Sequence, residues 1–136
     1  MSARTPSILY IEDSLASRNL MQIMIRDVMR FEKFAMLENT ANLTKNIEAL
    51  GLPFDLILLD LDIQPIDGYQ ACQLLKASPQ WKDTRIVALT ASAFVAEMRR
   101  MQEVGFDGAL SKPISYVDFP QKILSVLNGE SVWEIE

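Results

Sequence analysis

One segment, from Asp55 to Asp62, constrains the fold of this chain more than any other. Residues 56–59 form an aliphatic run that leads directly into Asp60. An apolar run this short, bounded by charge, is typical of a strand buried on both faces of a parallel sheet. Such sheets place their functional groups at the carboxyl ends of the strands. Asp60 is therefore expected either at a functional edge of the sheet or as a turn residue that caps the next helix.

The same construction recurs along the chain. Short apolar segments, each typical of a strand, occupy residues 7–11, 34–37, 55–60, 85–89 and 108–110. Stretches with apolar residues at helical spacing lie between and after them, around residues 21–28, 43–50, 72–75, 94–101 and 119–127. This alternation predicts a doubly wound α/β domain with a five-stranded parallel sheet and five helices.

Chemically useful groups follow four of the predicted strands. They are two acids after the first strand, a third acid, a hydroxyl and an ammonium, namely Glu12, Asp13, Asp60, Thr90 and Lys112. The chain has no histidine, which excludes a histidine-based catalytic triad and a histidine-ligated zinc site. Carboxylates, hydroxyls and lysine suit Mg²⁺ and phosphoryl groups better than acyl transfer.

Length and composition fit one domain without a membrane or nucleic-acid surface. A chain of 136 residues with 49% hydrophobic content can bury a core with helices on both faces of a sheet. A net charge of −5 disfavours a surface that neutralises phosphates. No apolar run approaches the roughly 20 residues of a membrane span, and no signal peptide is evident, so a cytoplasmic location is expected. The single cysteine, Cys72, is expected to be a small core residue, not a reactive thiol.

The strand-end residues resemble those of the receiver domain of two-component response regulators. The resemblance spans residue 7 to about residue 128 and depends on five segments in the right order. They include Glu12-Asp13, Asp60, Thr90-Ala91 and Lys112-Pro113, supported by Asp67-Gly68 and by residues 89–93 and 105–108. It implies a flavodoxin-like fold, with a receiver domain over residues 1–128 and a tail over residues 129–136. Residues 111–115 also resemble single-domain regulators and the receivers attached to hybrid kinases. A stand-alone receiver is expected, because no pattern of a DNA-binding or enzymatic domain follows residue 128 in the sequence.

The resemblance also implies a magnesium site. Asp13 and Asp60 would bind Mg²⁺ directly, the backbone carbonyl of Asp62 would be a third protein ligand, and Glu12 would act through water. The physical requirement is clear, because a carboxylate that attacks an anionic phosphoryl group needs a cation to offset the repulsion.

The remaining implied roles concern the phosphoryl group. Asp60 would be the phosphoacceptor, Lys112 would pair with a phosphoryl oxygen, and Thr90 would donate a hydrogen bond to another. The Lys112-Pro113 peptide bond would be cis. The donor would be a histidine kinase or a histidine phosphotransfer protein, and the chain would catalyse only its own phosphorylation and dephosphorylation. Output would go through protein contacts to a downstream target, with a homodimer as a further candidate assembly.

Two departures from the family pattern affect these expectations. Ile63 and Gln64 stand where receivers usually carry Met-Pro, and Pro65 comes one residue late. Ala109 stands three residues before the lysine, where receivers generally have an aromatic ring that moves on phosphorylation. Phe106 either fills some of that space or is a core residue at the end of the fourth helix. The loss of the ring favours, as an alternative function, a receiver-like binding module that works without phosphorylation.

A second alternative is a phosphatase. Asp62 lies two residues after Asp60, the spacing of the acid/base aspartate in haloacid dehalogenase-type phosphatases. The motif lies on the third strand instead of near the start, and no later pair of metal-binding aspartates follows Lys112. These two features disfavour the phosphatase.

The chain end leaves two structural alternatives open. Ser115 and Asp118 have the spacing of a capping box, so the fifth helix is expected to begin there. Apolar and polar residues then alternate over residues 131–136 around Trp133. This period of two suits an added edge strand or a docking peptide, and a frayed terminus is the alternative.

Overall fold

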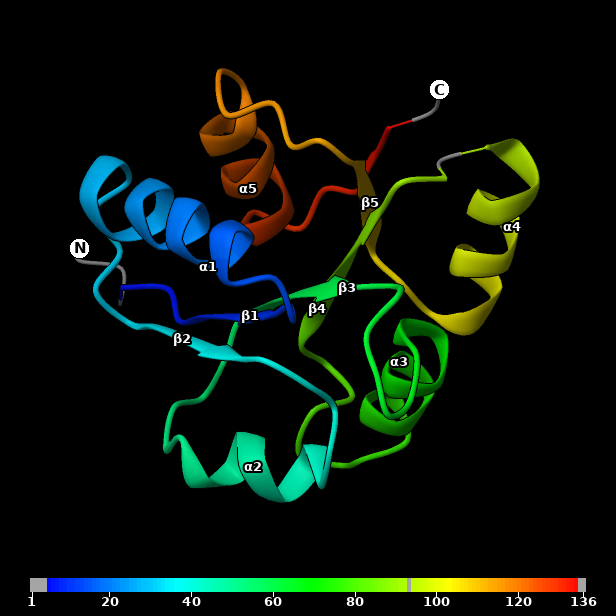
Figure 1. The fold of residues 1–136 in the computed structure, drawn as a ribbon. Helices are drawn as coiled ribbons and strands as arrows, with labels where there is room; N and C mark the ends of the chain where they lie inside the picture. Colours follow the sequence, from blue (N-terminus) through cyan, green and yellow to red (C-terminus); the bar gives the residue numbers. More distant parts are fainter. Residues whose placement is uncertain (1–4, 93, 135–136) are drawn as a thin grey trace.

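A six-stranded parallel sheet forms the centre of the protein (Figure 1). The structure is a computed structural model that describes residues 5–92 and 94–134. The strand order is β2-β1-β3-β4-β5-β6. The strands are β1 (Ile8–Ile11), β2 (Phe34–Leu37), β3 (Leu56–Asp60), β4 (Arg85–Thr90), β5 (Gly108–Ser111) and β6 (Val132–Trp133). Ala93, Ile135 and Glu136, which belong to the sequence patterns above, lie outside the described residues.

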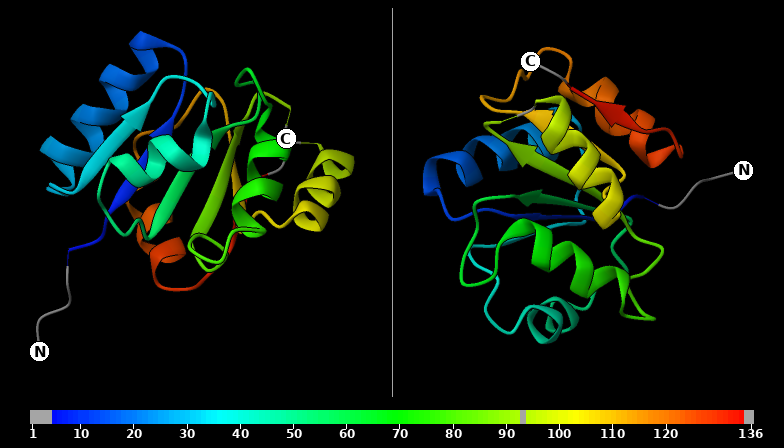
Figure 2. Two further views of the ribbon diagram at one scale, coloured as in Figure 1. Left: turned by 90° about the horizontal axis from the view of Figure 1, so that it is seen from below. Right: turned by 90° about the vertical axis from the view of Figure 1, so that its right-hand side faces the viewer.

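Helices cover both faces of the sheet (Figures 1 and 2). They are α1 (Leu15–Gln22), which continues into the π-helical segment η1 (Ile23–Val28), α2 (Leu43–Ala49), α3 (Gly68–Lys76), α4 (Val95–Val104) and α5 (Phe119–Leu127). One core cluster packs α1, η1 and α5 against the sheet, and the other packs α2, α3 and α4 against the opposite face. The predicted doubly wound fold is therefore confirmed. Within the described residues no helix is long and apolar enough to cross a membrane.

Strand β3 contributes side chains to both core clusters, one on each face of the sheet. All of its residues are buried, as the uninterrupted aliphatic run predicts. Successive side chains of a strand point to opposite faces of the sheet. Ile57 and Leu59 accordingly belong to the cluster under α2, α3 and α4, whereas Leu56 and Leu58 belong to the cluster under α1 and α5. This central position fixes Asp60 at the carboxyl edge of the sheet.

The prediction of five strands was wrong, because the tail adds a sixth. Strand β6 pairs in parallel with β5, with Val132 opposite Gly108 and Trp133 opposite Ala109. Of the alternatives for the tail, the added edge strand is the one observed. Gly108 permits the close approach, because a Cβ atom at that position would lie 2.6 Å from the carbonyl oxygen of Val132.

The expected start of α5 at Ser115 was also wrong. The helix begins at Phe119 with Asp118 as its N-cap residue and with Pro120 in its first turn. A helix that began at Ser115 would place Pro120 in its interior, where proline lacks the N–H group and clashes with the preceding turn. In the first turn proline is favourable, so Pro120 sets the start of the helix.

Candidate functional site

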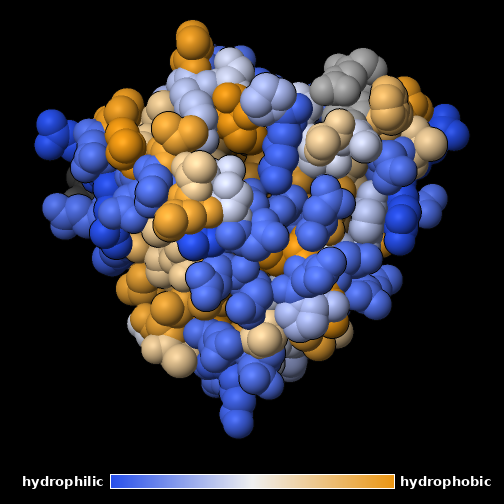
Figure 3. Space-filling view, in the orientation of Figure 1, coloured by the Kyte–Doolittle hydropathy of each residue, from blue (hydrophilic) through white to orange (hydrophobic). Residues whose placement is uncertain are grey.

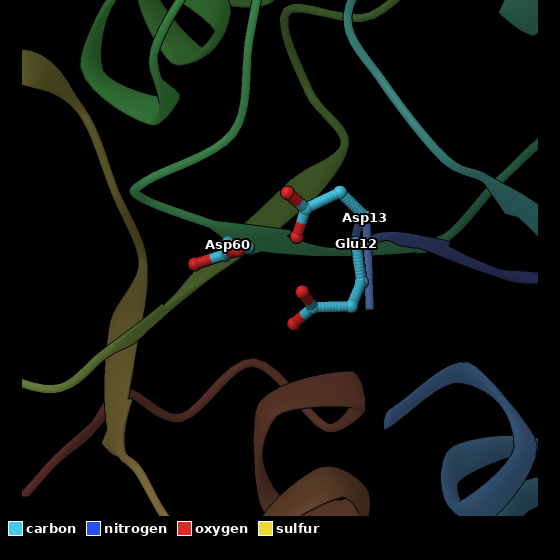
Figure 4. Close-up of side chains that lie close together, drawn as sticks. All are labelled: Glu12, Asp13 and Asp60. Atoms are coloured by element: carbon cyan, nitrogen blue, oxygen red, sulfur yellow. The ribbon is translucent and has the colours of Figure 1, made fainter. Parts of the chain in front are cut away.

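Three carboxylates converge at the carboxyl edge of the sheet (Figure 4). Glu12 and Asp13 follow β1, and Asp60 ends β3. The two strands are neighbours in register, with Ile11 opposite Leu59, so these residues reach the same level of the edge. One carboxylate oxygen from each residue lies within 4.8 Å of the others. Glu12 and Asp60 are buried, whereas Asp13 is exposed and opens the cluster to solvent. A set of carboxylate oxygens with an open side fits Mg²⁺, which prefers oxygen ligands and retains water.

Lys112 closes the site from β5. Its Nζ atom lies 3.0 Å from Oδ1 of Asp60 and 3.1 Å from Oε1 of Glu12. Burial lowers the pKa of Lys112, but the hydrogen bonds and charges of Asp60 and Glu12 outweigh that effect, so its pKa is raised above its usual value. The ammonium therefore stays protonated and neutralises part of the negative charge. The peptide bond between Lys112 and Pro113 is cis, as predicted.

Tyr10 supports the site, and the sequence did not single it out. Its hydroxyl donates a hydrogen bond of 3.1 Å to Oε1 of Glu12, and the backbone N–H of Ser14 donates one of 3.2 Å to Oε2. Burial and the Glu12 carboxylate raise the pKa of Tyr10, so the hydroxyl keeps its proton. Tyr10 lies two residues before Glu12 in an extended segment, and a tyrosine at that spacing could have been read as a hydrogen-bond partner on the same face.

Thr90 and Asp62 lie beside the carboxylates, at the end of β4 and in the loop after β3. Thr90 ends β4 and is buried, and its Oγ1 accepts a hydrogen bond of 3.0 Å from the N–H of Ser92. The backbone N–H of Asp62 donates a bond of 3.2 Å to Oδ1 of Asp60, so this residue contacts the cluster through its main chain. The Asp62 side chain is exposed and is not among the three carboxylates that converge. Asp62 and Thr90 both line a groove of about 650 Å³ beside the site.

The loop after β3 follows a path that the sequence did not predict. The peptide bond between Gln64 and Pro65 is cis. The carbonyl of Gln64 accepts a bond from the N–H of Thr40, and the Thr40 hydroxyl bonds to both the N–H and the carbonyl of Ile66. The buried Thr40 therefore anchors this loop to the loop after β2.

A second tyrosine ties two helices together on the far side of the groove. The Tyr69 hydroxyl donates a bond of 2.8 Å to Glu97 of α4, and the guanidinium carbon of Arg100 lies 3.8 Å from the centre of the Tyr69 ring. Burial and Glu97 raise the pKa of Tyr69 to about 12. Phe106 is buried and packs edge-on against Tyr69 at 6.1 Å. Phe106 is thus a core residue, and the Ala109 side chain next to β6 is fully buried.

The polar character of the site extends over the surface around it. Figure 3 shows hydrophilic residues across the centre of this face, with hydrophobic residues at several separate places around it. Exposed apolar side chains of α1 and η1 include Leu15, Leu20, Ile23 and Val28.

The comparison with protein families agrees with this arrangement. The model of the response regulator receiver domain matches residues 8–124. The chain belongs to the response regulator receiver family. It is a receiver domain homologous to those of two-component and phosphorelay proteins.

Two of the curated relatives differ strongly in how much of their length this chain covers. The sensor histidine kinase GacS of Pseudomonas protegens is 32% identical over 130 residues, which cover 91% of this chain but only 13% of the kinase. The chain thus spans about an eighth of the length of that relative. The polar-differentiation response regulator DivK of Brucella ovis is 28% identical over 127 residues, which cover 90% of this chain and 97% of DivK.

Solved structures show the same fold. The receiver domain of a sensor histidine kinase from Pseudomonas aeruginosa PAO1 superposes with a TM-score of 0.76 at 24% sequence identity and covers 93% of this chain and 100% of that chain. That structure has a magnesium ion coordinated in its active site cleft.

Proposed function

We propose that this receiver accepts a phosphoryl group on Asp60 in a two-component or phosphorelay pathway, with Mg²⁺ as the cofactor. The observation that carries the proposal is the convergence of Asp60, at the end of the central strand, with two further carboxylates and the Lys112 ammonium. Asp60 is 3% exposed, so it is presented at the edge of the sheet without being freely solvated. The magnesium ion in the related receiver structure supports the choice of cofactor.

Each residue of the site has a proposed role. Asp13 and Asp60 bind Mg²⁺ directly, with the backbone carbonyl of Asp62 as a third ligand, and Glu12 binds it through water. When bound, the ion would reduce the repulsion between the attacking carboxylate and the phosphoryl oxygens. Tyr10 holds Glu12 in position by its hydrogen bond.

Two further side chains act on the phosphoryl group itself. Lys112, already 3.0 Å from Asp60, exchanges part of that ion pair for a phosphoryl oxygen as the aspartyl phosphate forms. The Thr90 hydroxyl donates a hydrogen bond to another phosphoryl oxygen. Chemistry by these residues is confined to phosphorylation and dephosphorylation of Asp60, and no separate substrate is turned over.

The partners follow from the same proposal. The phosphoryl donor is a histidine kinase or a histidine phosphotransfer protein, the two kinds of donor that phosphorelays use. The relatives GacS and DivK support this class of partner. Output goes to a downstream protein, with a homodimer as a further candidate assembly. We place the end of the receiver unit near residue 128 and treat residues 129–136 as an addition to it.

The test is phosphorylation of the purified protein by acetyl phosphate and Mg²⁺, measured by intact mass. A stable gain of one phosphoryl group that disappears in Asp60→Asn supports the proposal. Asp83→Asn, an exposed acid remote from the cluster, is the matched control and should still be phosphorylated. Persistence of the gain in Asp60→Asn would assign the acceptor to another acid. Rapid turnover of added phosphate monoesters would identify a phosphatase, and neither gain nor turnover would identify a binding module.

A further inference from the structure

The tail strand β6 is bonded directly to the segment that carries Lys112. Strand β6 runs along β5 at the edge of the sheet (Figures 1 and 2). The N–H of Glu134 donates a bond of 3.0 Å to the carbonyl of Ala109. The pairing needs Gly108, because any Cβ atom there would collide with the β6 backbone. The glycine at position 108 therefore allows β6 to pair with β5.

The side chain of Glu134 extends this contact to the residue before Lys112. Strand β6 ends at Trp133, so the outward N–H of Ser111 has no further strand to bond with. The Glu134 carboxylate accepts this hydrogen bond instead of a strand carbonyl. Its Oε1 atom accepts one hydrogen bond of 2.7 Å from the Ser111 N–H and one of 3.3 Å from the Ser111 hydroxyl. The other oxygen, Oε2, pairs with Lys122 of α5.

Lys122 makes this junction a link between three elements. Its ammonium also pairs with Asp118 at 3.1 Å, at the start of α5. The side chains of Lys122 and Glu134 are only 23% and 24% exposed, so their attraction is partly shielded from water. Glu134 therefore holds β5, β6 and α5 together one residue before the cationic group of the site.

Lys112 is fixed from the opposite side as well. Its own N–H donates a bond of 2.8 Å to the carbonyl of Thr90 on β4. The backbone around Lys112 is thus held between β4 on one side and Glu134 on the other. A long lysine side chain loses considerable rotamer freedom when it is placed between two carboxylates, so a fixed backbone reduces the entropic cost of its placement.

We propose that Glu134 is a positioning residue that fixes Ser111 and thereby aims Lys112 at the phosphoryl site of Asp60. Docking of β6 onto β5 and binding of a phosphoryl group at Asp60 are then thermodynamically linked. Docked β6 raises the affinity of the site for the phosphoryl group, and a bound phosphoryl group stabilises the docked form of β6. This inference rests on the proposed function, because it assigns Lys112 to the phosphoryl group.

The first test compares the affinity for beryllofluoride, which the inference expects to fall in Glu134→Ala, with the affinity for Mg²⁺, which it expects to stay nearly unchanged. Beryllofluoride, which mimics a phosphoryl group, should bind Glu134→Ala about tenfold more weakly in the presence of saturating Mg²⁺. The affinity for Mg²⁺ alone should stay within about twofold, because the proposed metal ligands lie at and just after the ends of β1 and β3, away from β6. Glu134→Gln, which keeps an acceptor for Ser111 but loses the pair with Lys122, should restore part of the affinity. Glu130→Ala, an exposed tail acid, is the control with the same change of charge.

The second test is a double-mutant cycle with Lys112→Ala. If Glu134 acts through Lys112, Glu134→Ala should cause no additional loss of beryllofluoride affinity in the Lys112→Ala background. An equal loss in both backgrounds would overturn the inference, as would unchanged affinity in Glu134→Ala. Gly108→Ala displaces the β6 backbone without touching either side chain and should reproduce the effect of Glu134→Ala. Thermal unfolding of each variant verifies that it is folded.

A third measurement does not depend on phosphoryl chemistry. Amide hydrogen exchange at Ser111 should accelerate in Glu134→Ala, and the two Hε resonances of Lys112 should become equivalent as the side chain gains freedom. Retention of both signals as in the wild type would overturn the inference. If the wild type neither binds beryllofluoride nor becomes phosphorylated, the proposed function fails, and the two NMR signals alone decide whether Glu134 positions Lys112.

Discussion

At the residue scale, the carboxylates of the site differ in how they are held. Glu12 is buried and has three partners, Tyr10, Ser14 and Lys112, whereas Asp13 is exposed and faces the open side of the cluster. A carboxylate that already accepts several hydrogen bonds is suited to act through water, and an exposed one can bind the ion directly. The inner and outer ligands of the proposed magnesium site can therefore be told apart by substitution.

We predict that Asp13→Asn weakens Mg²⁺ binding more than Glu12→Gln does. Loss of a direct charged ligand should reduce the affinity by about tenfold to a hundredfold, and loss of a water-mediated contact by less. Titration of Mg²⁺ into each variant, followed by calorimetry or by the fluorescence of the protein, measures the difference. Equal losses, or a larger loss for Glu12→Gln, would reverse the assignment of the two ligands.

A further prediction concerns Asp62. Its side chain is exposed and lines the groove beside Asp60, where it could orient or deprotonate the water that attacks an aspartyl phosphate. Asp62→Asn should lengthen the lifetime of the phosphorylated state by a few-fold, roughly two to ten times. The decay of the phosphorylated species after removal of the donor gives the lifetime. An unchanged lifetime would limit the role of this residue to its backbone.

At the element scale, β6 has an apolar residue in contact with the core. Trp133 is half-buried and packs against the cluster under α3 and α4, opposite the small side chain of Ala109. Deletion of residues 130–136 should lower the free energy of unfolding by about 1–3 kcal/mol, the scale of burying one large side chain. In a Trp81→Phe background, the fluorescence of Trp133 should be blue-shifted relative to free tryptophan.

Chemical denaturation of the protein with and without residues 130–136 measures the change in the free energy of unfolding. An emission spectrum of the Trp81→Phe variant measures the shift of the Trp133 fluorescence. Ser131→Ala, at an exposed tail position, is the control for an effect of substitution alone. A solvent-like spectrum together with unchanged stability would contradict the packing of Trp133.

The elements also show what a sequence of this kind can predict. The strands and the acids at their ends were predictable, because β3 has an uninterrupted apolar run that ends in Asp60 and the apolar run of β1 is followed directly by Glu12 and Asp13. The start of α5 was missed because a local capping pattern at Ser115 competed with Pro120, and the proline prevailed. A two-residue strand such as β6 has little preference of its own and depends on the free edge of β5 and on Gly108. Tyr69 was missed because its partner Glu97 comes from another helix.

At the scale of the whole molecule, the site concentrates opposite charges that folding brings together from distant parts of the chain. Glu12 follows β1, Asp60 ends β3 and Lys112 follows β5, and the two acids are almost completely buried. Burial of a charge without an opposite charge nearby is costly, and removal of the Lys112 ammonium leaves the two buried carboxylates without their cationic partner. In the absence of Mg²⁺, Lys112→Met should lower the free energy of unfolding at neutral pH by about 1–3 kcal/mol.

The ion pairs of Lys112 with Asp60 and Glu12 also make the difference in the free energy of unfolding between the wild type and Lys112→Met depend on pH. The folded protein raises the pKa of Lys112 above its ordinary value of 10.5, so the folded state retains the proton more strongly than the unfolded chain does. The contribution of Lys112 is therefore complete below the unfolded pKa and is lost as the pH rises through the higher folded pKa. Urea unfolding of the wild type and of Lys112→Met at about pH 8 and about pH 11 should show a smaller difference at the higher pH. A difference that is the same at both values would mean that Lys112 stabilises the fold by packing of its aliphatic part and not by its charge.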